Sequence, residues 1–115
     1  MPIKSEIKLS VELDDKKVPT KIEWQATDAD FDGKKECRAM MLSLWDKNEN
    51  ATLGIDLWSK EMTVEDMNIY IHQSLIKMSD TFLRATKNKE AAQMIENFSA
   101  ELAEKLGLDK NVTKG

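Results

Sequence analysis

Apolar and polar residues alternate along three stretches in the first half of the chain, at residues 7–13, 40–45 and 52–58. A period of two places successive side chains on opposite faces of a strand, so each stretch predicts a strand with one apolar face. The polar segment 46–50, Asp-Lys-Asn-Glu-Asn, separates the last two stretches. Two such runs around a short polar break predict a β-hairpin of antiparallel strands.

A further strand is expected at residues 21–26, where Ile22, Trp24 and Ala26 share one face. Pro19 precedes this strand and cannot donate a backbone hydrogen bond to a strand ladder. The polar residues 27–35 that follow predict a loop. The first half of the chain therefore predicts strands and turns, without helices.

The second half predicts two helices. Thr63 precedes Val64-Glu65-Asp66, which is typical of a helix N-cap with an acid near the first amides. In residues 64–86 the apolar positions form two stripes, and such a helix must be covered on two sides. The first stripe comprises Val64, Met67, Ile71, Leu75, Met78, Phe82 and Ala85, and the second comprises Ile69, Ile76 and Leu83. Residues 89–106 carry one stripe, and Gly107 is suited to end that helix.

The element order ββββαα predicts an α+β fold, with a four-stranded antiparallel sheet followed by two C-terminal helices packed on one face. We expect the long first helix to bury Ile71, Leu75, Met78 and Phe82 against the sheet. The length allows one domain, so residues 1–108 are predicted as a single α+β domain. Residues 109–115 have nothing to bury and are expected to be a flexible C-terminal tail.

The predicted hairpin has an unusual second face. With a loop at residues 47–50, Trp45 pairs with Thr52 and Ser43 pairs with Gly54. The leucine-rich face (Leu42, Leu44, Leu53, Ile55, Leu57) then points to the core, which leaves Met41, Trp45 and Trp58 on the opposite face. An aromatic and methionine patch beside a polar surface is typical of an interface core. In the alternative, Trp45 and Trp58 curl over the sheet edge and pack on the helices.

Charge and composition exclude several classes of function. The chain has 17 basic and 21 acidic side chains, with both signs interspersed, so we expect no nucleic-acid binding. The first ten residues hold no signal-peptide core, and no run approaches the roughly 20 apolar residues that span a bilayer. A lone Cys37 suits a reducing compartment, so we expect a cytoplasmic protein without a transmembrane segment. The glycines are isolated, and no cofactor is expected.

The segment Asp28-Ala29-Asp30-Phe31-Asp32-Gly33 is the sharpest local motif. It places carboxylates at positions 1, 3 and 5 and glycine at position 6 of a twelve-residue calcium loop. The closing glutamate of such a loop is replaced by Ala39. We therefore predict an exposed, metal-free acidic loop whose residues serve turn chemistry. Asp28, Asp30 and Asp32 remain weaker candidates for calcium ligands.

Cys37 and His72 are the only cysteine and histidine in the chain. A nucleophilic thiolate needs an imidazole within hydrogen-bond reach and a group that orients it. Cys37 begins an expected strand, whereas His72 lies in the middle of an expected helix. We therefore predict no catalytic residues, and a small enzyme built on these two side chains is kept as an alternative.

The stretch LWDKNENATLGIDLWSKEM, followed by the helix pattern M-x-x-x-x-HQ-x-L-x-x-M-x-DTF-x-RAT, resembles the gliding motility protein GldC family of Bacteroidetes. The opening SEIKLSVELDDKKVPTKIEWQA is similar to the start of that family, so the resemblance extends to about Leu106. It implies a small soluble cytoplasmic protein that supports surface gliding, a process tied to an envelope motor and its secretion system. It implies no active site, cofactor or ligand.

Together these observations predict a non-enzymatic cytoplasmic accessory protein of gliding motility that acts by binding protein through Met41, Trp45 and Trp58. The expected partner is a component of the gliding or secretion machinery, or a second copy of the chain. One alternative is a calcium-responsive regulatory module that uses the Asp28-Asp30-Asp32-Gly33 loop. Another is a secretion-chaperone-like binding protein, because some export chaperones also pair a four-stranded sheet with C-terminal helices.

Overall fold

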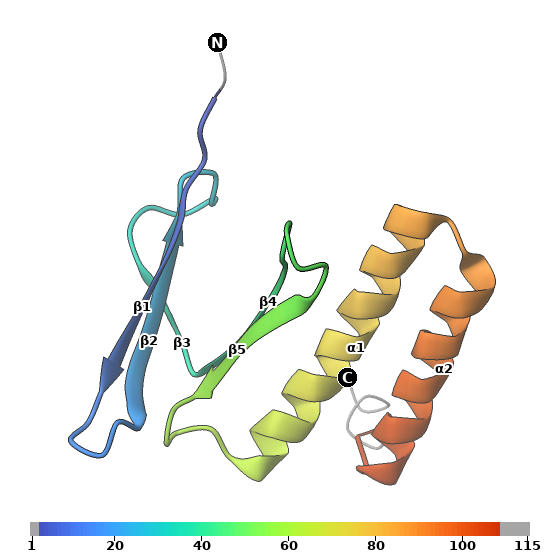
Figure 1. Cartoon of the computed structure of the whole chain (residues 1–115). Coiled ribbons are helices and arrows are strands. Elements are labelled where there is room, and N and C mark those ends of the chain that lie inside the picture. Colours follow the sequence, from blue (N-terminus) through green and yellow to red (C-terminus); the bar gives the residue numbers. More distant parts are fainter. Residues whose placement is uncertain (1–2, 109–115) are drawn as a thin grey trace. The chain divides into compact units, whose positions relative to one another are not determined.

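The structure is a computed structural model that describes residues 3–108, and these form two compact units (Figure 1). The strand unit, up to Met62, contains five strands, and the helical unit, from Thr63, contains two helices. The strands are β1 (Ile7–Leu13), β2 (Pro19–Ala26), β3 (Lys35–Cys37), β4 (Ala39–Trp45) and β5 (Thr52–Trp58). The helices are α1 (Val64–Thr86) and α2 (Lys89–Lys105). The chain is therefore an α+β protein, as its sequence predicts.

The strands form two small antiparallel sheets instead of the one four-stranded sheet that we expected. One sheet has the order β1-β2-β3, and the other consists of β4 and β5. The difference comes from β3, which pairs Cys37 with Ile22 before the chain bends at Arg38 and enters β4. The packing of the helices on a sheet and the single domain at 1–108 stay predictions. The expected tail at 109–115 lies outside the described residues.

The turn between β1 and β2 is organised by Asp14. The carboxylate of Asp14 accepts hydrogen bonds from the backbone amides of Lys16 and Val18, and it forms an ion pair of 2.6 Å with Lys60 after β5. The bond from Lys60, followed by the backbone bonds, lowers the pKa of Asp14 to about 2. Because this pKa lies below the unfolded value, the pairing stabilises the fold near neutral pH and is lost as the pH falls toward 2.

Pro19 is the first residue of β2 and pairs with Leu13, so this strand begins two residues earlier than expected. A register shift between Glu12 and Leu13 accommodates the proline at the strand end, where its missing N–H costs no interior ladder bond. Further along the strand Ile22 is fully buried, with Val11 as its neighbour on β1 and Cys37 on β3. Ile22 is therefore the centre of the small core of the strand unit.

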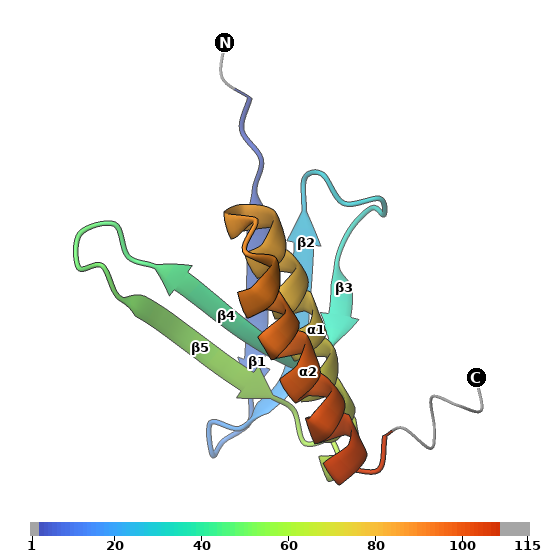
Figure 2. The same ribbon diagram turned by 90° about the vertical axis from the view of Figure 1, so that its right-hand side faces the viewer.

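Figure 2 shows β4 and β5 as a hairpin, and the pairing of the two strands has the expected register. Trp45 pairs with Thr52, and Ser43 pairs with Gly54, as predicted. The carboxylate of Asp46 accepts hydrogen bonds from the amides of Asn48 and Glu49, while the amide of Asp46 donates to the carbonyl of Ala51. The loop at residues 47–50 is thus closed by local hydrogen bonds, and these hold the pairing that decides which side chains share a face.

Both helices begin and end at capping residues. Thr63 accepts from the amide of Asp66, whose side chain accepts in return from the amide of Thr63, which is a capping box. Asn88 caps α2 in the same way through the amide of Ala91. At the other end of α2, Gly107 has a φ of 75°, and the amide of Leu108 donates to the carbonyl of Ala103.

Small residues line the contact between α1 and α2. Ser79 on α1 and Ala92, Ser99 and Ala103 on α2 are all buried. The hydroxyl of Ser79 donates to the carbonyl of Ala92 at 2.8 Å. Side chains of this size let α1 and α2 approach each other closely.

The apolar stripe that we expected to be buried on α1 is only partly covered. Within the described residues, Ile71, Leu75 and Phe82 are half-buried and Met78 is exposed. The expected packing of these four side chains on the sheet stays a prediction. On α2, Met94 and Phe98 are exposed as well. The sequence-based stripe marks apolar side chains correctly, but the helix contact uses the small residues beside it.

The two buried serines predict opposite effects of removing a hydroxyl group. Ser79→Ala loses a hydrogen bond and should lower the free energy of unfolding by about 0.5–1.5 kcal/mol. The Ser99 hydroxyl is buried and has no hydrogen-bond partner within residues 3–108, so Ser99→Ala should leave that free energy unchanged or raise it by up to about 1 kcal/mol. Urea denaturation of the two variants tests this difference. Equal losses in both would contradict it.

Candidate functional site

The hairpin carries a surface that we call the Trp face. Its residues come in four cross-strand pairs, in order along the hairpin: Ala39–Trp58, Met41–Asp56, Ser43–Gly54 and Trp45–Thr52. The two tryptophans therefore stand at opposite ends of the face, separated by six residues of strand, or roughly 20 Å. Between them lies the pair Ser43–Gly54, which has almost no side-chain bulk. The three sequence-predicted residues share one face, but the two tryptophans lie too far apart to contact each other.

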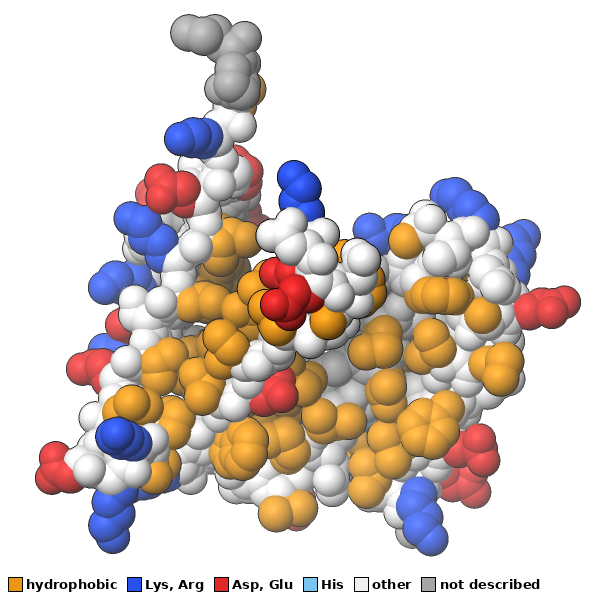
Figure 3. All heavy atoms as spheres, in the orientation of Figure 1, with side chains coloured by type: hydrophobic (Ala, Val, Ile, Leu, Met, Phe, Trp, Pro, Cys, Tyr) orange, Lys and Arg blue, Asp and Glu red, His pale blue; other side chains and the backbone are white. Residues whose placement is uncertain are grey.

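The three predicted partner-binding side chains are exposed. The exposed fraction is 68% for Trp45, 55% for Trp58 and 42% for Met41. Trp58 also borders an open pocket of about 240 Å³, together with Lys17, Val18 and Pro19 at the start of β2. Each of these side chains is exposed, so it is available for contact with a binding partner. Figure 3 shows apolar side chains at the surface of both units.

The opposite, leucine-rich face of the hairpin is less buried than we expected. Leu42 and Leu57 are half-buried, whereas Leu44, Leu53 and Ile55 are about half exposed. The expected face is correct because the register is correct, but the strand unit does not build a core on it. An isolated two-stranded hairpin is marginal in water, so partly exposed apolar residues on both faces favour further contacts for this hairpin.

The sequence interpretation missed the centre of the Trp face. Gly54 and Ser43 are paired there. From the sequence, both residues were interpreted as ordinary positions of a polar strand face. The available signal was a glycine in the middle of a seven-residue strand, away from any turn. A glycine at such a place weakens a strand unless it serves a bulge or the close approach of another backbone.

The acidic loop is held by contacts inside the strand unit. Asp28, Asp30 and Asp32 are exposed, as expected. Asp28 accepts a hydrogen bond of 2.6 Å from the Ser5 hydroxyl. The ring of Phe31 packs edge-on against that of Trp24, with 5.2 Å between the ring centroids. These contacts agree with a structural role for the loop.

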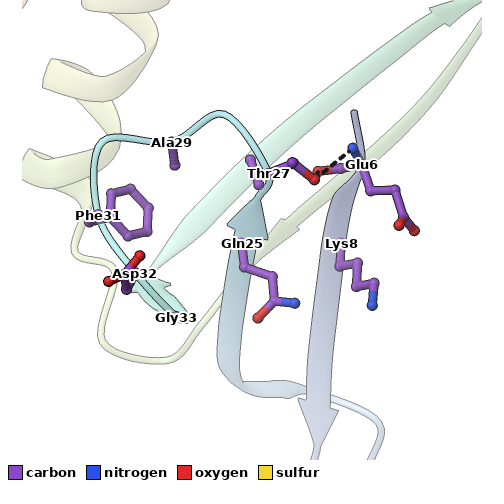
Figure 4. Close-up of a pocket in the computed structure, with 9 residues that line it drawn as sticks. Glu6, Lys8, Gln25, Thr27, Ala29, Phe31, Asp32 and Gly33 are labelled. Carbon is purple, nitrogen blue, oxygen red and sulfur yellow. Dashed lines mark hydrogen bonds between the residues drawn. The ribbon is translucent and has the colours of Figure 1, made fainter. Parts of the chain in front are cut away.

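An open pocket of about 240 Å³ lies beside this loop (Figure 4). Lys8 and Gln25 line it from β1 and β2, and Phe31, Asp32 and Gly33 line it from the loop. Figure 4 also shows the hydroxyl of Thr27 accepting from the amide of Glu6 beside the pocket. The lining includes both signs of charge.

The loop does not have the helix–loop–helix surroundings in which a calcium-binding loop of this type normally lies. Of the twelve residues that would form a calcium loop, those at positions 8–10 are strand β3, and Ala39 at position 12 begins β4. The preceding element, β2, is a strand where an EF-hand has a helix. Within residues 3–108, no group of three or more His, Cys, Asp or Glu side chains is arranged to hold a metal ion. Calcium binding stays a hypothesis without support from the fold.

The structure gives Cys37 the environment of an unreactive thiol. Cys37 ends β3 and is half-buried, and burial raises the pKa of its thiol, with only partial opposition from a backbone hydrogen bond with Ala39. His72 lies on α1, in the other compact unit. A catalytic cysteine needs the opposite, a lowered pKa with an imidazole beside it.

Cys37 should therefore react slowly with a thiol reagent at neutral pH, at least about tenfold more slowly than a free cysteine, because less of it is thiolate and it is partly covered. The measurement is the labelling rate of the native protein, with the urea-unfolded chain as the matched control. A native rate above that of the unfolded chain would favour the enzyme alternative.

One comparison with known proteins decides the family. A family model described as "Gliding motility-associated protein GldC-like" matches residues 19–108, which is more than half of the chain. The chain belongs to the GldC-like family. Comparisons with curated proteins and with solved structures found no match. The family description names a process and no reaction.

The region matched by the GldC-like model contains both the acidic loop and the Trp face. It runs from the start of β2 to the end of α2 and includes the acidic loop and the whole Trp face, whereas β1 lies before it. Neither helix in the described part of this GldC-like chain is long and apolar enough to cross a membrane. The Trp face is thus part of the segment that defines the family.

Proposed function

We propose that this GldC-like protein is a non-enzymatic accessory protein of gliding motility that acts in the cytoplasm by binding protein through the Trp face. The observation that carries the proposal is the exposure of Trp45 and Trp58 on one face of a hairpin whose register is fixed by local hydrogen bonds. The process comes from the family. The partner is a component of the gliding or secretion machinery or a second copy of the chain.

Physical chemistry favours binding as the use of this face. Each tryptophan ring buries about 150–250 Å² when it is covered, and Trp is among the residue types most enriched at binding hot spots. Met41 adds a flexible apolar contact between them. The face carries a single charged residue, Asp56, which agrees with the depletion of charge in interface cores. Nothing comparable supports catalysis, since Cys37 is partly buried and its pKa is raised.

The test combines gliding with protein capture. Trp45→Ser and Trp58→Ser, singly and together, should abolish rescue of gliding in a strain that lacks the protein, and should reduce capture of its partner at least tenfold. Met94→Ser is the matched control, because Met94 is also exposed but lies on α2. Circular dichroism of each purified variant establishes that it is folded. Normal gliding with the folded double variant would refute the proposed role of the Trp face.

A secretion-chaperone-like activity is a second candidate, favoured by the exposure of apolar side chains on both faces of the hairpin. The fold analogy behind it is weaker than the sequence suggested, because the strands form two sheets rather than one of four strands. A chaperone binds unfolded clients, so it should delay the aggregation of an unfolded protein in vitro. If the protein does not delay aggregation at stoichiometric excess while gliding still depends on Trp45 and Trp58, the chaperone hypothesis fails and the accessory-protein proposal stands.

A further inference from the structure

Within the described part of the strand unit, nothing requires a glycine at position 54. It does not have a positive φ, and it pairs with Ser43 in a regular register without a bulge. A Cβ atom at this position would meet only the carbonyl oxygen of Leu42, at an ordinary contact distance of 3.7 Å. Glycine weakens a strand, and the described strand unit does not require it here. The close approach of another backbone is a physical reason for glycine at such a place.

Large and small side chains alternate on the Trp face, so that one copy of the face can pack against a second copy. Each tryptophan is paired across the hairpin with a small residue, Trp58 with Ala39 and Trp45 with Thr52. The central pair, Ser43–Gly54, is small on both strands. Sheets that pack face to face need large side chains of one layer opposite small ones of the other. The Trp face has a small residue across the hairpin from each tryptophan, so two copies of it can place large side chains opposite small ones.

We propose that the Trp face packs on the Trp face of a second copy of the chain, which makes the protein a symmetric dimer with Gly54 near its centre. This inference rests on the proposed use of the Trp face for binding and names its occupant. A two-fold interface uses the same patch on both copies, so the patch must be self-complementary. The size pattern of the four cross-strand pairs meets that requirement.

Two orientations of the two-fold axis satisfy the pattern. With the axis along the strands, Trp58 of one copy faces Ala39 of the other, and Trp45 faces Thr52. With the axis across the strands, Trp58 faces Thr52 and Trp45 faces Ala39. In both orientations each ring meets a small residue, and the central small residues let the backbones approach.

The charge of the face is compatible with a second copy, and the size of the face sets the expected affinity. Asp56 is the single charged residue on the face, and it meets Met41 of the other copy in the first orientation and Gly54 in the second, never a second carboxylate. A face with one charged residue offers few ion pairs to a partner that binds through charge. A face of two seven-residue strands is smaller than a standard interface of about 800 Å² per partner, so the dimer should dissociate in the micromolar range or above.

Sedimentation of the full chain from low to high micromolar concentration tests the dimer. The wild-type protein should show a reversible monomer–dimer equilibrium. Gly54→Val adds bulk at the centre and should raise the dissociation constant roughly tenfold or more, while its circular dichroism stays that of the wild type, because valine favours strands. Trp58→Ser should weaken the dimer as well. Ser10→Val, which adds a similar group to exposed β1, is the matched control and should change nothing.

A wild-type protein that remains monomeric over this range would overturn the dimer, as would a dimer that is insensitive to Gly54→Val. If the protein is a monomer but Trp45 and Trp58 are still required for gliding, a different protein occupies the face, and only the dimer is lost. If the dimer forms and responds to Gly54→Val while Trp-substituted protein restores gliding, the proposed function fails and the dimer stands.

Discussion

Ile22→Ala should lower the free energy of unfolding of the protein by about 2–5 kcal/mol, the range for a large aliphatic side chain lost from a buried site. Ile22 has no exposed surface and lies in the central strand of the three-stranded sheet. Domains have total stabilities of about 5–15 kcal/mol, and such a loss would leave the strand unit marginal.

Two variants calibrate this measurement by urea denaturation. Ile22→Val removes one methylene group and should cost about 0.5–1.5 kcal/mol. Ile7→Ala removes the same atoms as Ile22→Ala, from an exposed position on the neighbouring strand, and should change the free energy by less than about 0.5 kcal/mol. A loss below about 1 kcal/mol for Ile22→Ala would show that Ile22 is not the centre of a core.

The elements that the sequence predicts well are those with local signals. Both helices begin at the expected residues, because Thr63 and Asn88 act as N-caps through hydrogen bonds that span only three residues. The register of the hairpin follows from alternation and from the short loop after Trp45, which leave one pairing that keeps the leucines on one face. The sequence therefore predicts that Met41, Trp45 and Trp58 share one face, but it did not draw out the small Ser43–Gly54 pair between the tryptophans.

The features that the sequence does not predict depend on contacts between distant residues. β3 is Lys-Glu-Cys, which has no apolar alternation, and it becomes a strand because β2 offers it a partner. The Lys60–Asp14 ion pair joins residues far apart in the chain. The same limit explains Met78, since an apolar stripe shows which side chains favour burial but not which of them the neighbouring helix covers. Gly54 belongs to the same group, because only the register shows that this glycine lies in neither a turn nor a bulge.

Ala92→Leu should lower the free energy of unfolding of the helical unit by about 1–3 kcal/mol, because three added carbon atoms must enter a contact built from small residues. Ala92 is 4% exposed, and its carbonyl accepts the hydrogen bond from Ser79, so a larger side chain would push that bond apart. Ala100→Leu is the matched control on an exposed position of the same helix. Alanine and leucine have similar helix propensities, so the control should change stability by less than about 0.5 kcal/mol. Urea denaturation followed by far-ultraviolet circular dichroism measures both variants. Equal stability of the two would show that the α1–α2 contact is loose enough to accept a leucine, and the close packing inferred from Ser79, Ser99 and Ala103 would then be wrong.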